Sequence, residues 1–254
     1  MIEAIDLSKR YSNGTLALDA LNLRVEAGEI YCLLGVKGAG KTTVINLLLG
    51  FLQPTSGTAR IDGIDVEREP LRAKSRVAYL ADTTAFYRRL TALRNLDFFA
   101  RLGGRRSPSR HECEMALREV GLPELAFDQR VSELGPGGIR KLGIAAALMK
   151  GAPALVLDEP LSGLDPKAAA ELVELIEGLR DQGKALLITM QDLFWARQLA
   201  DRVGILQEGR QALTRTREEL RYENLEKLYL DYMRGGLRSG GGANPGLPRE
   251  GRRD

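Results

Sequence analysis

A glycine-rich segment that ends in lysine and threonine carries the strongest chemical signal in this sequence. It fits the phosphate-loop pattern G-x-x-x-x-G-K-T and reads Gly35-Val36-Lys37-Gly38-Ala39-Gly40-Lys41-Thr42-Thr43. Glycines let backbone N–H groups converge on a phosphate, and a helix that begins near Lys41 would add the positive end of its dipole. Lys41 would then reach the β and γ phosphates, and the Thr42 hydroxyl suits Mg²⁺, which prefers oxygen ligands. The segment predicts a magnesium nucleotide site, in which Lys37 either contacts a phosphate or stays in solvent.

Two adjacent carboxylates follow a buried strand in the second half of the chain. Leu155-Val156-Leu157 is an apolar run, and Asp158-Glu159-Pro160 comes directly after it. Ligands of open α/β sheets bind at the carboxyl ends of strands, so Asp158 can hold Mg²⁺ through water. Glu159 would face the γ phosphate and polarise a water molecule. An Asp-Glu pair by itself is more often a polar strand end, but its occurrence together with a phosphate loop favours the catalytic interpretation.

The elements that must position these groups alternate between strands and helices. Strand-like runs at 2–7 and 21–25, separated by a turn-prone Ser-Asn-Gly cluster, predict an antiparallel β start. A buried strand at 29–34 runs into the phosphate loop, and 41–50 has helical apolar spacing. Further buried strands are expected at 76–80, 154–157, 185–189 and 203–206. The alternation predicts an α/β fold with a mostly parallel sheet.

Helical segments interrupt this pattern and close it. Apolar residues recur at every third position in the first such segment, at Leu90, Leu93, Leu96 and Phe99. The closing segment, 224–233, predicts an amphipathic helix whose apolar face carries Leu225, Leu228, Tyr229 and Tyr232. Residues 235–254 hold seven Gly, two Pro and four Arg. We expect this Gly/Arg-rich tail to be disordered, because it has too little apolar surface to offset the entropy of ordering.

Composition argues against several other classes of function. The tail contributes two of the three net positive charges, so the body is nearly neutral, and only 6% of the 254 residues are aromatic. No nucleic acid is therefore expected as a partner. One histidine and two cysteines are too few for a multi-histidine metal centre, a zinc site or a disulfide framework. No apolar run approaches the roughly 20 residues of a membrane span, so a partner would supply any span.

Together these motifs resemble the nucleotide-binding subunit of ATP-binding cassette (ABC) transporters over about residues 1–233. Residues 155–160, followed by Ser162-Gly163-Leu164-Asp165, are similar to the family's Walker B motif and D-loop. Tyr11 lies where the family places an aromatic ring that stacks on adenine. The resemblance implies a P-loop NTPase fold with an antiparallel β subdomain and a helical subdomain at about 84–150, inside an ABC ATP-binding domain of residues 1–234. Segments 90–102 and 224–230 resemble the ABC-2 type exporter branch most.

The resemblance also implies partners. In this family two ATP-binding subunits face each other, and each ATP with its Mg²⁺ lies between the phosphate loop of one subunit and a signature loop of the other. A homodimer and a heterodimer with another ABC ATP-binding subunit both stay open. Transmembrane permease subunits of ABC-2 type would supply the transport path. The chain is then expected in the cytoplasm, peripheral on the cytoplasmic face of the cell membrane.

Two departures from the family's pattern concern positions that would stabilise the reacting phosphate. Asp82 stands where the family has a glutamine that contacts Mg²⁺ and the attacking water. Its carboxylate can still bind Mg²⁺, but it adds a negative charge close to three phosphates. Gln191 stands where the family has its switch histidine. Gln191 can donate a hydrogen bond to the γ phosphate but cannot carry a charge.

The third departure lies in the signature loop, where Gly135-Pro136-Gly137-Gly138 replaces the family's Ser-Gly-Gly-Gln/Met. Gly135 removes a serine hydroxyl, and Pro136 removes a backbone N–H. Proline suits the first turn of a helix, so a helix N-terminus with its dipole should remain here. The resemblance accordingly assigns Gly135, Gly137 and Gly138 to the ATP of a facing subunit.

We therefore expect an ATP hydrolase that drives export with slowed hydrolysis, and whose catalytic residues are Glu159, Gln191 and Asp82. Losing one preorganised donor to a transition state typically costs about 10² to 10³ in rate. The alternative is a catalytically impaired ATP-binding regulatory subunit of the same complex. Glu159 favours the first interpretation, and the departures favour the second. Soluble ABC proteins of ribosomes or DNA usually resemble two fused cassettes or carry long coiled coils, and neither pattern is found in this sequence.

Overall fold

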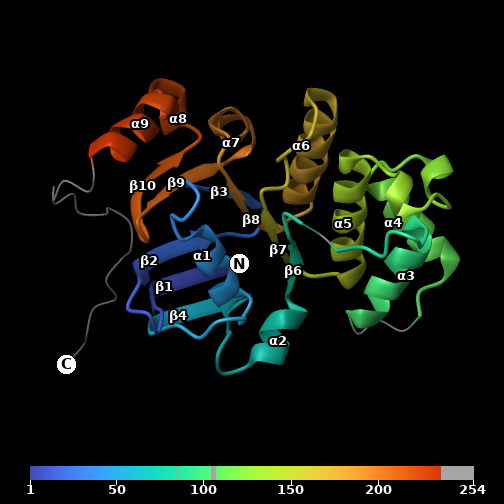
Figure 1. Cartoon of the computed structure of the whole chain (residues 1–254), viewed down its shortest axis with the longest axis horizontal. Coiled ribbons are helices and arrows are strands. Elements are labelled where there is room, and N and C mark those ends of the chain that lie inside the picture. The colour runs from blue at the N-terminus through green and yellow to red at the C-terminus, as the bar shows by residue number, and fades with distance from the viewer. Residues whose placement is uncertain (84, 104–106, 236–254) are drawn as a thin grey trace.

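Within the described residues of this computed structural model, 1–83, 85–103 and 107–235, the strands form two sheets (Figure 1). The first is antiparallel, has the order β2-β1-β4-β5, and contains β1 (Ile2–Arg10), β2 (Leu16–Val25), β4 (Ser56–Ile61) and β5 (Ile64–Asp65). The second has the order β10-β9-β3-β8-β7-β6 and contains β3 (Glu29–Leu34), β6 (Val77–Leu80), β7 (Ala154–Asp158), β8 (Ala185–Met190), β9 (Arg202–Gln207) and β10 (Arg210–Thr216). Its pairings are parallel except that of β10 with β9. The predicted antiparallel start and mostly parallel sheet are confirmed.

Helices flank the second sheet and extend past its β6 edge. They are α1 (Lys41–Leu48), α2 (Pro70–Ser75), α3 (Ala92–Leu102), α4 (Arg110–Glu119), α5 (Pro136–Lys150), α6 (Pro166–Asp181), α7 (Leu193–Leu199), α8 (Glu219–Tyr222) and α9 (Leu225–Gly235). Short 3₁₀ turns occur at Glu124–Ala126 and Val131–Glu133. Figure 1 shows α3, α4 and α5 gathered beyond β6, and α8 and α9 near β10 and β9 at the opposite edge.

Both faces of the parallel sheet are buried, which explains why its strands are continuous apolar runs rather than alternating ones. Successive residues of β3 belong to two different hydrophobic clusters. Ile30, Cys32 and Leu34 lie in the cluster that includes α3 to α6. Tyr31 and Leu33 lie in the cluster that includes α1 and the antiparallel sheet. The strand that precedes the phosphate loop is therefore held from both sides.

The helical insertion follows the sequence pattern except at its start. The leucine repeat begins at Leu90, but α3 begins at Ala92 because Thr91 caps the helix: the Thr91 side chain accepts a hydrogen bond from the Arg94 N–H at 3.2 Å. Leu93 and Leu96 pack in the same cluster as the residues of β6 and β7. These helices thus share a hydrophobic core with the sheet.

Some elements carry a weaker signal than the strands of the core. The sequence analysis assigned no strand to 56–61, 64–65 or 210–216, where β4, β5 and β10 lie. Small and charged residues interrupt these segments, and most of β10 is only half-buried. The closing helix, predicted at 224–233, is α9, and its start is fixed by Asn224, whose Oδ1 accepts from the Lys227 N–H at 2.9 Å. The tail predicted at 235–254 lies, beyond Gly235, outside the described residues.

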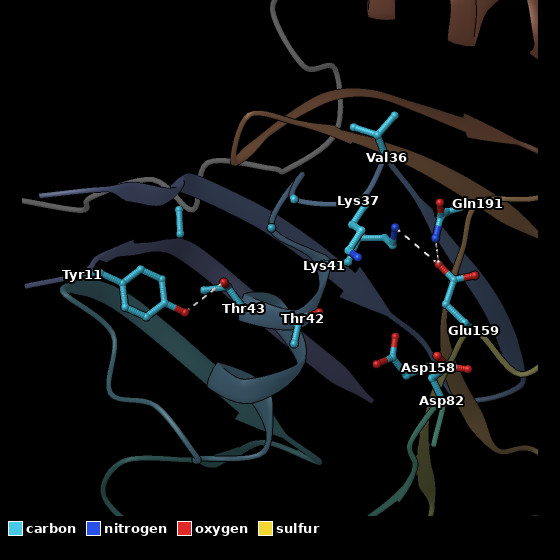
Figure 2. Close-up of a pocket in the computed structure, with 13 residues that line it drawn as sticks. Tyr11, Val36, Lys37, Lys41, Thr42, Thr43, Asp82, Asp158, Glu159 and Gln191 are labelled. Carbon is cyan, nitrogen blue, oxygen red and sulfur yellow. Dashed lines mark hydrogen bonds and ion pairs between the residues drawn. The ribbon is translucent and has the colours of Figure 1, made fainter. Parts of the chain in front are cut away.

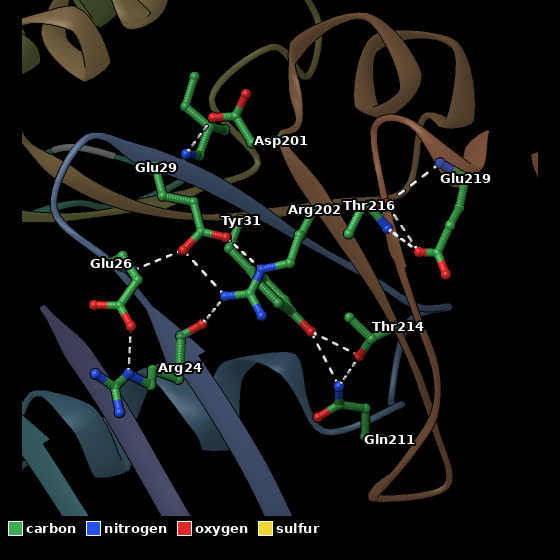
Figure 3. A network of polar contacts seen from close by, with 11 residues as sticks. Arg24, Glu26, Glu29, Tyr31, Asp201, Arg202, Gln211, Thr214, Thr216 and Glu219 are labelled. Atoms are coloured by element: carbon green, nitrogen blue, oxygen red, sulfur yellow. Dashed lines mark hydrogen bonds and ion pairs between the residues drawn. The ribbon is translucent and has the colours of Figure 1, made fainter. Parts of the chain in front are cut away.

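A polar network fastens β9 and β10 to β3 (Figure 3). Arg202 of β9 forms a two-pronged pair with Glu29 of β3, in which one of the bonds measures 3.0 Å. The Gln211 amide of β10 donates to the Tyr31 hydroxyl at 3.1 Å. Burial, ahead of every other cause, raises the pKa of Tyr31 to about 12. The network secures the half-buried edge strand to the strand that carries the phosphate loop.

The helices of the described residues include none that is both long and apolar enough to cross a lipid bilayer.

Candidate active site

Parallel strands β3, β8, β7 and β6 are neighbours in the sheet, and each ends at a residue predicted to do chemistry. β3 runs into the phosphate loop, β8 precedes Gln191, β7 ends at Asp158, and β6 lies two residues before Asp82. These ends border one pocket of about 520 Å³ (Figure 2). It is lined by Tyr11, Ala17, Val36, Lys37, Gly38, Gly40, Lys41, Thr42, Thr43, Asp82, Asp158, Glu159 and Gln191. Every lining residue except Ala17 was predicted from the sequence.

The phosphate loop adopts a conformation that its glycines permit. Gly38 and Gly40 have φ angles of 87° and 112°, which side-chain-bearing residues rarely adopt. A Cβ on Gly35 would lie 2.7 Å from the Leu206 carbonyl oxygen of β9. Among the described residues no side chain caps α1, and its first turn has no acidic residue. The helix N-terminus is thus left for an anion, which it attracts through its N–H groups and its dipole.

Lys41 is buried and already holds two acceptors. Its Nζ donates to the Gly35 carbonyl oxygen at 2.5 Å and lies 3.4 Å from Glu159 Oε1. The Gln191 amide donates to the same Glu159 oxygen at 3.1 Å (Figure 2). Glu159 is therefore oriented by one charged group and one neutral group. A phosphate entering the loop would compete with Glu159 for Lys41, whereas it would leave the contact with Gln191 available.

Thr189 of β8 holds the Asp158 carboxylate and the Glu159 backbone, and it was not predicted from the sequence. Its Oγ1 donates to Asp158 Oδ1 at 2.5 Å and accepts from the Glu159 N–H at 3.2 Å. The Glu159 N–H also reaches the Thr189 carbonyl oxygen at 3.0 Å, and Glu159 has a φ of 46°. This left-handed conformation turns the chain sharply after Asp158. The available signal was one hydroxyl residue in the otherwise apolar and fully buried strand β8.

Asp82 is paired with a basic residue, contrary to the expectation of an uncompensated negative charge. Arg140 of α5 donates to Asp82 Oδ1 at 2.9 Å and to the backbone carbonyl oxygens of Ala81 and Asp82. The sequence analysis missed this partner because 58 residues separate the two and only tertiary folding brings α5 to the end of β6. The guanidinium offsets much of the repulsion that Asp82 would exert on a bound phosphate.

Tyr79 of β6 is a further polar neighbour of this site. Burial, followed by the charge of Asp158, a hydrogen bond with the Asp158 side chain and the charge of Asp82, raises the pKa of Tyr79 to about 12. Tyr79 therefore remains protonated at neutral pH and can donate to Asp158. A tyrosine on a core strand is ordinarily interpreted as packing, so the sequence held no distinct signal for this contact.

Tyr11 lies at the pocket, whereas the signature glycines lie away from it. Tyr11 lines the pocket, and its hydroxyl lies 3.2 Å from Thr43 Oγ1. Gly135, Gly137 and Gly138 do not line it. Gly135 is the residue before α5, and Pro136 is the first residue of that helix, as predicted. Within one chain, the structure thus brings together the phosphate loop and the strand-end residues, but not the signature loop.

The oxygen ligands of the pocket suit Mg²⁺. The Thr42 hydroxyl and the Asp158 carboxylate both line it, beside the loop that would hold phosphates. In the described part of the chain, no group of three or more His, Cys, Asp or Glu side chains could hold a metal ion by itself. Mg²⁺ typically binds through one or two protein oxygens together with water and phosphate oxygens. The donor set therefore fits a magnesium nucleotide better than a metal cage made entirely of protein.

Comparison with known proteins gives a consistent assignment. Residues 18–162 match the family described as ABC transporter. The daunorubicin/doxorubicin resistance ATP-binding protein DrrA of Streptomyces peucetius is 37% identical over 87% of this chain and 66% of its own length. The bacitracin transport ATP-binding protein BcrA of Enterococcus faecalis is 36% identical over 82% of this chain and 67% of its own. The chain thus spans about two thirds of the length of these relatives.

Solved structures share the fold. One described as the ATP-binding subunit of an ABC transporter superposes with a TM-score of 0.80 at 28% identity, covering 92% of this chain and 99% of that one. A dimeric ATP-binding cassette, MJ0796, bound to ADP and Pi has a TM-score of 0.76 at 24% identity, covering 85% and 99%. At that identity the second likeness concerns the fold alone.

Proposed function

This chain belongs to the ABC transporter family, and from that premise we propose that it is an ATP-binding subunit which drives export through a separate membrane permease, with slowed ATP hydrolysis. The observation that carries the proposal is the convergence of the phosphate loop, Asp158, Glu159 and Gln191 on one pocket. A phosphate-binding loop that faced no carboxylate would support binding alone. Here the carboxylate that could activate water already contacts the phosphate-binding lysine.

The roles proposed for the binding residues follow from their positions. The N–H groups of residues 38–43 and the Lys41 ammonium would hold the phosphates, and Tyr11 would stack on the adenine. Thr42 and Asp158 would hold Mg²⁺, with Asp82 at the border of that site. When bound, Mg²⁺ would bridge phosphate oxygens and neutralise the charge that develops on them. Lys37 is exposed, so either a phosphate contact or a solvated position is compatible with the loop.

Glu159 would act as the general base for hydrolysis. A water molecule would transfer a proton to Glu159 while its oxygen attacks the γ phosphorus, and the bond from that phosphorus to ADP would break to release phosphate. Gln191 would keep the Glu159 carboxylate oriented, because its amide donates to Oε1. As a neutral donor it would stabilise the transition state less than a charged one. This difference is one reason for expecting slow turnover.

A second chain would complete the site. Gly135, Gly137 and Gly138 lie outside the pocket of their own chain, so they are free to face the ATP of another subunit at the N-terminus of α5. The missing serine hydroxyl and the proline would remove two donors there, while the helix dipole would remain. A homodimer would carry this defect in both sites. A heterodimer would place it in one site and the Gln191 substitution in the other.

Export is supported by the relatives and by two segments of the sequence. The relatives include a resistance protein, a bacitracin transport protein and, in Burkholderia lata, a Nod factor export ATP-binding protein. Segments 90–102 and 224–230 resemble the ABC-2 exporter branch. We therefore propose ABC-2 type permease chains as partners and a peripheral position on the cytoplasmic face of the membrane. The domain proposed is 1–234, with a helical subdomain at about 84–150.

Trapping the ATP-bound dimer tests this proposal. Glu159→Gln should bind Mg-ATP without turning it over, so size-exclusion chromatography with light scattering should detect a dimer that depends on ATP. The double variant Lys41→Ala/Glu159→Gln is the matched control and should stay monomeric. A Glu159→Gln variant that binds ATP but remains monomeric at all concentrations would rule out the homodimer and require a different partner cassette.

A second candidate function, an ATP-binding regulatory subunit with little hydrolysis, is favoured by one observation. Gln191, which occupies the switch position and donates to Glu159, is uncharged. In that case ATP would close the dimer, and release would depend on the partner. Binding of Mg-ATP by the purified chain with no hydrolysis above that of Glu159→Gln would favour this candidate over the motor.

A further inference from the structure

We propose that Arg140 is a positioning residue for the nucleotide site: it holds the Asp82 carboxylate and the backbone before it, and so joins the pocket to the start of α5. This inference rests on the proposed ATP-binding function but adds a residue and a link that the function does not require. All the contacts on which it rests are within a single chain, so it does not depend on a partner subunit.

Arg140 is anchored by three acceptors on the segment that follows β6. Its guanidinium donates to the Ala81 carbonyl oxygen at 3.1 Å, to the Asp82 carbonyl oxygen, and to Asp82 Oδ1 at 2.9 Å. Only 11% of the Arg140 side chain is exposed, whereas 53% of the Asp82 side chain is. The buried partner is therefore the arginine. The bonds to two backbone carbonyl oxygens fix the path of the segment. The bond to Asp82 Oδ1 compensates the charge of the carboxylate.

The pair changes the electrostatics of the pocket. Asp82 lines the pocket and Arg140 does not, so the guanidinium acts on the phosphate region through the carboxylate it holds. An unpaired carboxylate at this border would oppose a polyphosphate, and the opposition would be strongest where water is excluded. With Arg140 in place the pair is neutral. Removing Arg140 alone should thus weaken ATP binding, and removing the charge of Asp82 as well should restore it.

The same pair links two functional segments mechanically. Pro136, Gly137 and Gly138 form the start of α5, and Arg140 follows Gly138 by only two residues, within about one turn of the helix N-terminus. A shift of Asp82 on nucleotide binding would pull on that turn of α5. The signature loop, which the proposed dimer presents to the facing subunit, would then move with the occupancy of the chain's own pocket.

A double-mutant cycle tests the coupling with Arg140→Gln, Asp82→Asn and their combination. Affinity for Mg-AMPPNP, a non-hydrolysable ATP analogue, is measured by calorimetry on the purified chain. We expect Arg140→Gln to weaken binding about tenfold, because Asp82 would then present an unpaired negative charge to the phosphates. The affinity of Asp82→Asn is the reference for the double variant, in which the added Arg140→Gln change should cost no more than about threefold. The Arg140→Gln defect should also shrink at high salt, since salt screens repulsion.

Lys141→Gln is the matched control on the next residue of α5. Lys141 is 13% exposed and pairs with Glu171 at 2.7 Å, away from the pocket. Its loss should leave affinity within about twofold of the wild type, as expected for an ion pair distant from the ligand. Arg140→Lys, which keeps the charge, should bind better than Arg140→Gln, and thermal unfolding identifies any variant that fails to fold.

The outcomes separate the inference from the function. Affinities that are additive in the cycle, or an Arg140→Gln variant that binds like the wild type, would overturn the inference and leave the proposed function standing. If Arg140→Gln does not fold, Arg140→Lys and the double variant decide in the same way. Failure of the wild-type chain to bind the analogue would overturn the proposed function, and the inference with it.

Discussion

Lys41 and Glu159 form an ion pair that a bound phosphate would break. The Lys41 ammonium lies 3.4 Å from Glu159 Oε1, and both side chains are largely buried. Breaking a buried pair by removing one partner is costly, but a phosphate replaces the lost partner of lysine with a stronger one. Glu159 would then keep the Gln191 amide as its donor. Phosphate binding would thus prepare the proposed base, Glu159, by releasing it from the Lys41 ammonium.

Lys41→Ala should weaken Mg-ATP binding by about a hundredfold, since it removes the charge-assisted contact of a buried lysine. Lys37→Ala is the control, because it removes the same charge from an exposed position of the same loop. Equilibrium binding of a fluorescent ATP analogue measures both. Equal losses in the two variants would mean that net charge, not the position of Lys41, determines affinity.

Gln191→His should increase the turnover of ATP several-fold, and up to about a hundredfold if the new imidazole donates to the transition state as a cation. Steady-state phosphate release at saturating Mg-ATP is the measurement, with Gln191→Ala as the control that removes the donor altogether. Turnover of Gln191→His that equals the wild-type value would contradict the assignment of residue 191 as the switch position.

The elements of this fold place the chemistry at strand ends and hold each strand from both sides. β3 lies between β9 and β8, and the phosphate loop that follows it packs against the Leu206 carbonyl oxygen of β9. The network of Glu29, Arg202 and Tyr31 secures that side of the sheet. A loosened β9 would therefore loosen the loop. The stability of this edge of the sheet should therefore affect nucleotide binding.

Alkaline pH should weaken the fold through Tyr31. Burial raises its pKa to about 12 in the folded chain, above the usual value near 10, so the unfolded chain ionises first. The stability tied to this group is fully present below about pH 10 and is lost as the pH rises through about 12, by about 3 kcal/mol. Urea unfolding of the wild type and Tyr31→Phe at pH 9, 10 and 11 checks this. Equal slopes of stability against pH in the two proteins would contradict it.

The sequence predicted the elements with unbroken apolar runs better than the others. β3, β7, β8 and β9 each have the composition of a strand buried on both faces, and the structure finds them within a residue or two of the expected bounds. β4 and β10 are largely exposed or half-buried, so their composition resembles that of loops. The phosphate loop and the Asp158-Glu159 pair were predictable because each function needs fixed residue types at fixed spacing.

The contacts that orient those residues could not be predicted in the same way. Thr189 acts on Asp158 from the neighbouring strand, and Arg140 reaches Asp82 from a helix 58 residues away. Pairing of this kind depends on which elements the fold brings together. A sequence motif records the residues that contact a ligand, but not the distant partners that neutralise or position them.

At the scale of the whole molecule, the chain contains one part of a composite machine. Its pocket gathers the phosphate loop and the strand-end acids, while the start of α5 lies outside that pocket. We therefore propose that hydrolysis takes place between two facing subunits and that permease chains provide the transport path. We also propose that this chain itself hydrolyses ATP through Glu159, although three segments depart from the family's pattern.

Single-turnover hydrolysis tests that claim most directly. The purified chain and its Glu159→Gln variant are each mixed in excess with labelled Mg-ATP, at concentrations where both bind all of it, and the release of phosphate is followed. We expect slow but complete conversion to ADP by the wild type and no conversion above background by the variant. Tight binding with equal product from the two proteins would contradict it, and would leave an ATP clamp whose hydrolysis is supplied by another subunit.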